Sequence, residues 1–332
     1  MVTMIRTILL IIAFVAGLVI LDRAIGAMLR AAYDRTFTGE AGGQINEALQ
    51  NRNREVIVFG SSLARHQVDP SVLEAQLGTS AFNAGCNGQD IYYGRMLQSL
   101  LIGQGCESKH FVYVINWRDL VEDEIDRARM FSVFVDESAA IRQILAASLG
   151  QRVKLQSHAY RFNTLAISTM RQLMAPEYEG NDGFVPIAAD YTPSNRDFTD
   201  MDRDLRRGLT ASELGVMSSK LSLYRDFAAE ARRRNIVVTF VVSPTYREGR
   251  ERGPGEKLVL RQLSIVAAET KANFIMLDEF AIPAFQDVRY FGDPRHLNAR
   301  GAALFSRLLA SCLETERPDV AKTQHVDDLL GL

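Results

Sequence analysis

The sequence has few cysteines and no excess of positive charge. Its three cysteines, Cys86, Cys106 and Cys312, form no C-x-x-C pair, which excludes both a multi-disulfide framework and a cysteine zinc site. One disulfide bond is possible if the domain lies outside the cytoplasm. The sequence does not reveal which two of the three cysteines would form it. The formal net charge of -2 excludes a strongly basic nucleic-acid-binding domain, so we expect no nucleic-acid partner.

Long apolar runs are also scarce, with one exception near the N-terminus. Residues 7–21 carry no charge and lie between Arg6 and Asp22. The run is shorter than the roughly 20 residues of a complete membrane span, but residues 1–4 extend it if Arg6 reaches toward the lipid headgroups. Because small residues suited to cleavage are few, we predict an uncleaved transmembrane anchor over residues 1–22. A cleaved signal peptide and a buried helix of a soluble domain are the alternatives.

Short apolar runs alternate with helix-like segments along the rest of the chain. Because strands that alternate with helices form parallel sheets, we predict an α/β domain. Its fold is expected to be a flavodoxin-like three-layer sandwich with a five-stranded parallel sheet. The predicted strands are residues 55–59, 81–83, 111–115, 236–242 and 273–277.

The predicted domain organisation has four parts. The anchor (1–22) is followed by a polar stalk (23–54), an α/β domain (55–319) and a mobile tail (320–332). No segment between about residues 120 and 215 has the pattern of a strand. We therefore expect a mostly helical insertion there, which serves as a lid, as a partner surface or as helical padding.

A serine pair stands where the first predicted strand passes into a helix. Gly60-Ser61-Ser62-Leu63 follows an apolar run, and glycine permits the backbone angles of a sharp turn. A serine at this point lies at the carboxyl edge of the sheet, where open α/β folds bind their ligands. Ser62 is therefore a candidate nucleophile, although two serines here can also simply cap the helix.

A serine nucleophile needs a histidine that accepts its proton and an acid that orients the histidine. Among the five histidines, His296 lies between the last predicted strand and the last predicted helix, at the same edge of the sheet as Ser62. Asp293 stands three residues before it, within reach of its second ring nitrogen. The other four histidines have less suitable positions. His66 lies on the Ser62 helix and His110 at the opposite sheet edge, whereas His158 lies in the predicted insertion and His325 in the tail.

These blocks together resemble the SGNH, or GDSL-like, hydrolase superfamily over most of residues 55–313. The nucleophile block corresponds to Gly60-Ser61-Ser62-Leu63, with serine in place of the family's aspartate. The last block, Asp-x-x-His, corresponds to Asp293-Pro294-Arg295-His296. The second block corresponds to the segment that ends at Gly88. The third block, Gly-x-Asn-Asp in the family, is matched only in part by Asn116-Trp117-Arg118-Asp119.

The resemblance implies a triad of Ser62, His296 and Asp293 that uses no cofactor or metal ion. It also implies an oxyanion hole formed by the N–H groups of Ser62 and Gly88 and by the side chain of Asn116. The acyl group that Ser62 takes up would pass to water in an esterase or to a sugar hydroxyl in a transferase.

The anchor makes the chain similar to membrane-anchored SGNH proteins that modify cell-envelope polymers. Those include alginate-type O-acetyltransferases and the accessory protein of teichoic-acid D-alanylation, and such proteins commonly work beside a membrane-bound O-acyltransferase. We therefore expect an acyltransferase or esterase that acts on O-acyl groups, acetyl in the first place, of an envelope glycan or exopolysaccharide. A secreted-type carboxylesterase or lipase is one alternative. A non-catalytic scaffold that partners a membrane-bound O-acyltransferase is another.

The charges around the anchor oppose the side of the membrane that this resemblance implies. Arg6 precedes the apolar run, whereas Arg23, Arg30 and Arg35 follow it, and the positive-inside rule alone favours a cytoplasmic domain. Long domains can translocate despite nearby charge. We predict a single-pass protein of the inner (cytoplasmic) membrane whose catalytic domain is periplasmic or otherwise extracytoplasmic.

Overall fold

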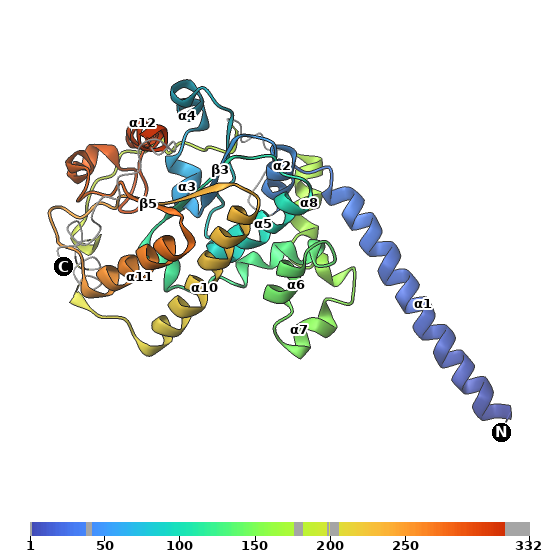
Figure 1. The fold of residues 1–332 in the computed structure, drawn as a ribbon. Coiled ribbons are helices and arrows are strands. Elements are labelled where there is room, and N and C mark those ends of the chain that lie inside the picture. The colour runs from blue at the N-terminus through green and yellow to red at the C-terminus, as the bar shows by residue number, and fades with distance from the viewer. Residues whose placement is uncertain (1, 38–41, 176–181, 198, 200–205, 316–332) are drawn as a thin grey trace. The chain divides into compact units, whose positions relative to one another are not determined.

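The chain, drawn as a ribbon in Figure 1, divides into two compact units. The first consists of Met1–Glu47 and Arg129–Tyr178, and the second of Ala48–Ala128 and Glu179–Leu332. The computed structural model describes residues 2–37, 42–175, 182–197, 199 and 206–315. The predicted mobile tail (320–332) lies outside them.

The second unit is built on a five-stranded sheet in which every pair of neighbouring strands is parallel. The strand order is β2-β1-β3-β4-β5. This confirms the prediction of an α/β domain with five parallel strands. The strands are β1 (Val56–Gly60), β2 (Ala81–Asn83), β3 (His110–Ile115), β4 (Val237–Val242) and β5 (Asn273–Met276).

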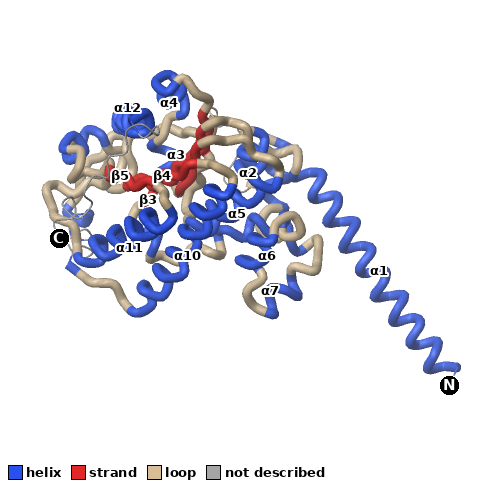
Figure 2. Tube along the Cα trace, in the orientation of Figure 1, coloured by secondary structure: helices blue, strands red, loops and turns tan. Residues whose placement is uncertain are grey.

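Two groups of helices flank this sheet. Figure 2 shows the sheet between α4 and α12 on one side and α10 and α11 on the other. The first group is α3 (Ser62–Gln67), α4 (Pro70–Leu77) and α12 (Ala299–Thr315), and the second is α5 (Ile91–Gly103), α10 (Ala211–Arg233) and α11 (Pro254–Thr270). The 3-10 helices η1 (Trp117–Leu120), η4 (Pro283–Gln286) and η5 (Val288–Tyr290) lie in the connecting loops.

Alternate strand residues pack against different helix groups, because successive side chains of a strand point to opposite faces. Val58 of β1 belongs to an apolar cluster with Leu309 of α12. Its neighbour Phe59 packs edge-on against Phe227 of α10, with ring centroids 5.1 Å apart. Both faces of the strand are therefore buried, which explains why the strands read as continuous apolar runs.

The first unit is helical in its described residues. Its α1 (Val2–Tyr33) is long and apolar enough to cross a membrane, which confirms the predicted apolar N-terminal helix. The helix continues beyond the predicted anchor, and Asp22 accepts hydrogen bonds from the N–H groups of His158 (2.8 Å) and Ala159 (3.1 Å). The described helices not yet named are α2 (Gly43–Gln50), η2 (Arg127–Phe134), α6 (Ala139–Leu145), α7 (Leu149–Lys154), η3 (Tyr160–Phe162) and α8 (Ala166–Met174). No disulfide bond joins any of the three cysteines in the described part of the chain.

Candidate active site

Ser62 stands at the carboxyl end of β1, where the strand passes into α3. The last strand residue, Gly60, has a φ of +147°, and a Cβ atom there would lie 2.7 Å from the carbonyl oxygen of Val114. Only glycine therefore fits this turn without displacing β3. Ser61 caps α3, because its Oγ accepts a hydrogen bond from the N–H of Leu63 (3.4 Å). The capping role thus belongs to Ser61 and leaves the side chain of Ser62 free for another role.

A continuous chain of hydrogen bonds joins Ser62 to Asp293 through His296. Nε2 of His296 lies 2.7 Å from Oγ of Ser62, and Nδ1 lies 2.8 Å from Oδ2 of Asp293. Because the carboxylate accepts the proton on Nδ1, Nε2 is the acceptor for the serine hydroxyl. The structure thus brings together the three residues that the sequence predicted as nucleophile, base and acid.

The loop around His296 favours the ionised form of Asp293. Burial disfavours a charge on this carboxylate, but the hydrogen bond and charge of His296 and two backbone N–H groups outweigh burial and lower the pKa of Asp293. Those N–H groups belong to Arg295 and His296 and lie 2.8 and 2.9 Å from Oδ1. An ionised carboxylate at Nδ1 stabilises the imidazolium that forms when His296 takes up a proton.

Ser62 and His296 border a cavity of about 230 Å³ at the carboxyl edge of the sheet. The other two residues predicted for the oxyanion hole, Gly88 and Asn116, also line it. Charged side chains of both signs complete much of the wall: Asp90, Glu122, Glu124, Arg118, Arg127 and Arg295. The structure therefore gathers every predicted site residue except Asp293 around one polar cavity, and Asp293 reaches it through His296.

Two backbone N–H groups beside this cavity, those of Ser62 and Gly88, form no backbone–backbone hydrogen bond among the described residues. Ser62 begins α3, so its N–H has no carbonyl one turn earlier in the helix. Oδ1 of Asn116 accepts from the N–H of Arg118 (3.1 Å), which leaves Nδ2 as the third donor. Gly88 has a φ of +63°, a backbone conformation that favours glycine, and a Cβ atom there would make the guanidinium of Arg127 move.

Gln67 ties the helix of Ser62 to the loop of His296. Its side chain is fully buried, donates from Nε2 to the carbonyl of Arg295 (3.2 Å) and accepts from the hydroxyl of Ser243 (2.5 Å) just after β4. Sequence reasoning missed this residue. The only signal is a polar side chain among the buried positions of α3, and that pattern does not reveal a partner 228 residues away.

Residues 182–191 support the same loop and were also missed. The N–H of Val185 donates to the carbonyl of Arg65 (3.0 Å), and the N–H of Tyr191 donates to the carbonyl of Phe291 (2.9 Å). The sequence placed this segment in the polar part of the predicted insertion. Its contacts are made by backbone groups, which every residue type carries, so composition gave no signal for them.

The other described histidines bond to different partners. Nδ1 of His66 contacts the carbonyl of Val185 (2.6 Å), and its ring packs edge-on against His296 with centroids 5.7 Å apart. Burial lowers the pKa of His66, which favours a neutral neighbour beside His296. His110 contacts Oγ1 of Thr239 (2.7 Å). His158 lies in the first unit, and His325 lies outside the described residues.

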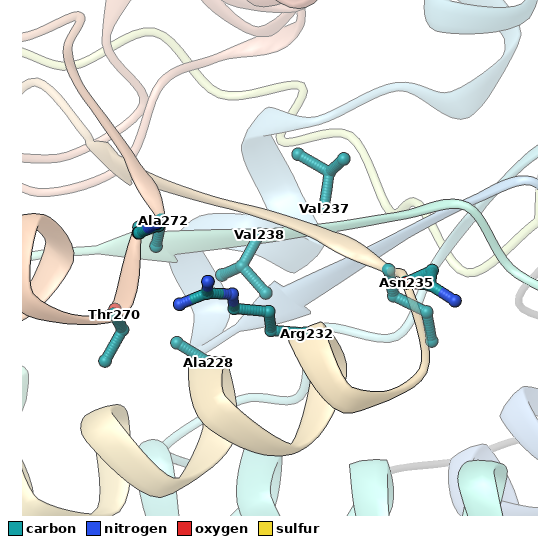
Figure 3. A pocket seen from close by; sticks show the side chains of 9 residues that line it. Ala228, Arg232, Asn235, Val237, Val238, Thr270 and Ala272 are labelled. Atoms are coloured by element: carbon teal, nitrogen blue, oxygen red, sulfur yellow. The ribbon is translucent and has the colours of Figure 1, made fainter.

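A second hollow lies at the opposite edge of the sheet and lacks this chemistry. It measures about 280 Å³ and lies between the end of α10 and the starts of β4 and β5. Figure 3 shows Arg232, Val238 and Thr270 on its wall. Its lining residues include no serine, cysteine, histidine or carboxylate, so the candidate active site is the cavity at Ser62.

No group of three or more histidines, cysteines or carboxylates in the described part of the chain could hold a metal ion. Comparison of the sequence with protein-family models and with curated proteins finds no match.

Proposed function

We propose that this protein is a membrane-anchored serine acyltransferase or esterase of the SGNH, or GDSL-like, type. The observation that carries the proposal is the 2.7 Å contact between Ser62 Oγ and His296 Nε2, continued by the 2.8 Å contact between Nδ1 and Asp293. A serine, an imidazole and a carboxylate bonded in this order form the arrangement that activates a hydroxyl for attack on an ester.

In the proposed reaction, His296 removes the proton from Ser62 as Oγ attacks the carbonyl carbon of an ester. The carbonyl oxygen takes up negative charge, which the N–H groups of Ser62 and Gly88 and Nδ2 of Asn116 can stabilise. One such donor is worth about 3–4 kcal/mol of barrier. His296 then gives its proton to the departing alcohol oxygen as the C–O bond breaks, and the acyl group stays on Ser62. Attack by water or by a sugar hydroxyl on the acyl-enzyme completes hydrolysis or transfer.

The sheet topology supports the same proposal. The order β2-β1-β3-β4-β5 is the one that flavodoxin-like three-layer folds have, and ligands of such folds bind where the strand order reverses, between β1 and β3. Ser62 lies two residues after the end of β1, and Asn116 directly follows β3. The proposed nucleophile and one proposed oxyanion donor therefore lie at the place where this topology favours a site.

As the physiological substrate we propose O-acyl groups, acetyl in the first place, of a cell-envelope glycan or exopolysaccharide. The support is the resemblance to anchored SGNH proteins together with the apolar helix α1. With α1 in the inner membrane and the second unit on the outer side, finished polymers would be within reach. A membrane-bound O-acyltransferase is the proposed protein partner, because it could deliver acyl groups across the membrane.

Labelling with a fluorophosphonate tests the enzymatic part of the proposal. The full-length protein in detergent should be labelled, Ser61→Ala should keep the label, and Ser62→Ala should lose it. A folded wild-type protein that takes no label and hydrolyses no p-nitrophenyl acetate would contradict the proposal and favour a non-catalytic scaffold.

Polymer analysis in a strain that lacks the protein tests the substrate. A lower acyl content of the envelope polymer is expected for a transferase, and a higher content for an esterase. An unchanged content in every envelope polymer would contradict the glycan assignment and favour a carboxylesterase or lipase of the secreted type.

A further inference from the structure

Lys220 of α10 is a fully buried lysine beside the proposed site. An ammonium group in a protein interior is costly unless its hydrogens are paired. Here its Nζ lies 2.5 Å from Oδ2 of Asp90 and 2.7 Å from the carbonyl oxygen of Asp119, and it also donates to the carbonyl of Glu122. Two of the three N–H donors of the ammonium therefore have carbonyl acceptors, and its charge is paired with the carboxylate of Asp90.

The carboxylate partner of Lys220 belongs to the segment that carries the first proposed oxyanion donor. Asp90 stands two residues after Gly88. Its Oδ1 accepts from the N–H of Tyr92 (2.8 Å) and caps α5, while its Oδ2 faces the ammonium. Asp90 therefore links the turn that contains Gly88 both to the start of α5 and, through Lys220, to α10.

The two carbonyl partners belong to the segment that carries the second proposed donor. Asp119 and Glu122 lie in and just after η1, the turn that Asn116 begins. Within this turn, Oδ2 of Asp119 accepts from the N–H of Asn116 (3.0 Å), and Oδ1 of Asn116 accepts from the N–H of Arg118 (3.1 Å). The hydrogen bonds of η1 thus connect the ammonium of Lys220 to the side chain of Asn116.

We propose that Lys220 is a positioning residue that sets the distance between the Gly88 N–H and the Asn116 side chain. This inference rests on the proposed function, in which both groups bind the oxyanion. Lys220 is not among the residues that line the cavity, so it acts through Asp90 and η1 and not on the substrate. Because oxyanion donors must be held in place before the charge develops, loss of this link should lower kcat more than it raises KM.

Kinetics of Lys220→Met in the full-length protein test the proposal. We expect kcat for p-nitrophenyl acetate to fall by about 10-fold to 100-fold, somewhat less than the loss of a whole donor, with KM changed by less than about 2-fold. The inhibition constant of an aryl trifluoromethyl ketone, which forms a tetrahedral adduct on serine, should rise by the factor by which kcat/KM falls. The matched control is Arg225→Met on the same helix, which removes only an exposed ion pair with Glu269 and should leave all three constants unchanged.

Amide hydrogen exchange gives a readout that does not depend on activity. In Lys220→Met, peptides covering residues 86–92 and 116–122 should exchange faster, while the exchange of peptides of β1 should not change.

If the single variant does not fold, the double variant Asp90→Asn with Lys220→Met is measured instead. It removes the unpaired buried charge and keeps the Oδ1 atom that caps α5. Unchanged kcat with an unchanged inhibition constant would overturn the proposal, as would unchanged exchange in both segments. A wild-type protein without activity would contradict the proposed function, whereas the exchange data would still show whether Lys220 links the two segments.

Discussion

Oγ of Ser62 and Nε2 of His296 lie 2.7 Å apart, although 234 residues separate them in the chain. The contact joins the end of β1 to the loop before α12 at the carboxyl edge of the sheet. This separation is within hydrogen-bond range, so the proton can pass from the serine to the histidine without a rearrangement of either side chain.

The two adjacent serines should differ sharply when each is replaced. Ser62→Ala should abolish hydrolysis of p-nitrophenyl acetate at an unchanged level of folded protein, because the proposed nucleophile is gone. Ser61→Ala should keep much of the activity and lose about 1 kcal/mol of stability, since it removes only the cap of α3. Initial rates and urea unfolding measure both effects. Equal losses of activity in the two variants would refute the assignment of Ser62.

Asn116→Ser separates the capping role of Asn116 from its proposed role as an oxyanion donor. Serine keeps a side-chain oxygen that can accept from the N–H of Arg118, but it lacks the amide nitrogen. We expect kcat to fall by about 10²-fold to 10³-fold, while the free energy of unfolding changes by less than about 0.5 kcal/mol. A variant with wild-type kcat would remove Asn116 from the proposed oxyanion hole.

Gln67→Leu should weaken both the fold and the proposed site. The change leaves the Ser243 hydroxyl and the Arg295 carbonyl without the hydrogen bonds that Gln67 makes with them. We expect a loss of about 2–4 kcal/mol in the free energy of unfolding, together with a lower kcat because the His296 loop shifts. The control is Gln76→Leu, which removes an exposed hydrogen bond to Ser311 and should change stability by less than about 0.5 kcal/mol. Equal stability of the two variants would show that Gln67 does not hold the loop.

His110 should make the fold sensitive to acid, independently of any activity. Burial lowers its pKa from 6.5 to about 4. Between these pH values the unfolded chain binds a proton that the folded chain does not. The stability contributed by neutral His110 is therefore complete above about pH 6.5 and is lost as the pH falls toward 4.

The replacement His110→Gln tests this pH dependence. Between pH 7 and pH 4.5, wild-type protein should lose on the order of 1–3 kcal/mol more of its unfolding free energy than the variant does. Urea unfolding at the two pH values measures the difference. The same pH dependence in both proteins would mean that His110 is protonated equally in the folded and unfolded states.

Reporter fusions should show on which side of the membrane the second unit lies. Alkaline phosphatase fused after Leu332 is expected to be active, and green fluorescent protein at the same place is expected to be dark, because the proposed polymer substrates lie outside the cytoplasm. Arg23, Arg30 and Arg35 favour the opposite orientation by the charge rule. An inactive phosphatase with a bright fluorescent fusion would place the unit in the cytoplasm and end the envelope-glycan proposal.

The elements of the second unit could be predicted from the sequence because their signals are local. A run such as Val56–Phe59 is apolar on both faces, which specifies a buried strand wherever it lies in the chain. Gly60 marks a sharp turn for a reason internal to the backbone, namely a positive φ. Asp293 and His296 are only three residues apart, so their contact depends on one turn of the chain and is visible as a short motif.

Other features were decided only by the tertiary structure, because they join residues that are far apart in the chain. Gln67 contacts Arg295 across a separation of 228 residues. Lys220 contacts Asp119 across a separation of 101 residues, and it also contacts the more distant Asp90. No local periodicity encodes such pairs. A buried glutamine or lysine is stable only where the packing of several elements supplies acceptors and donors for it. The sequence by itself therefore determined the strands, the turn at Gly60 and the Asp-x-x-His motif, whereas the packing of α3, α10 and the loops determined what surrounds Ser62.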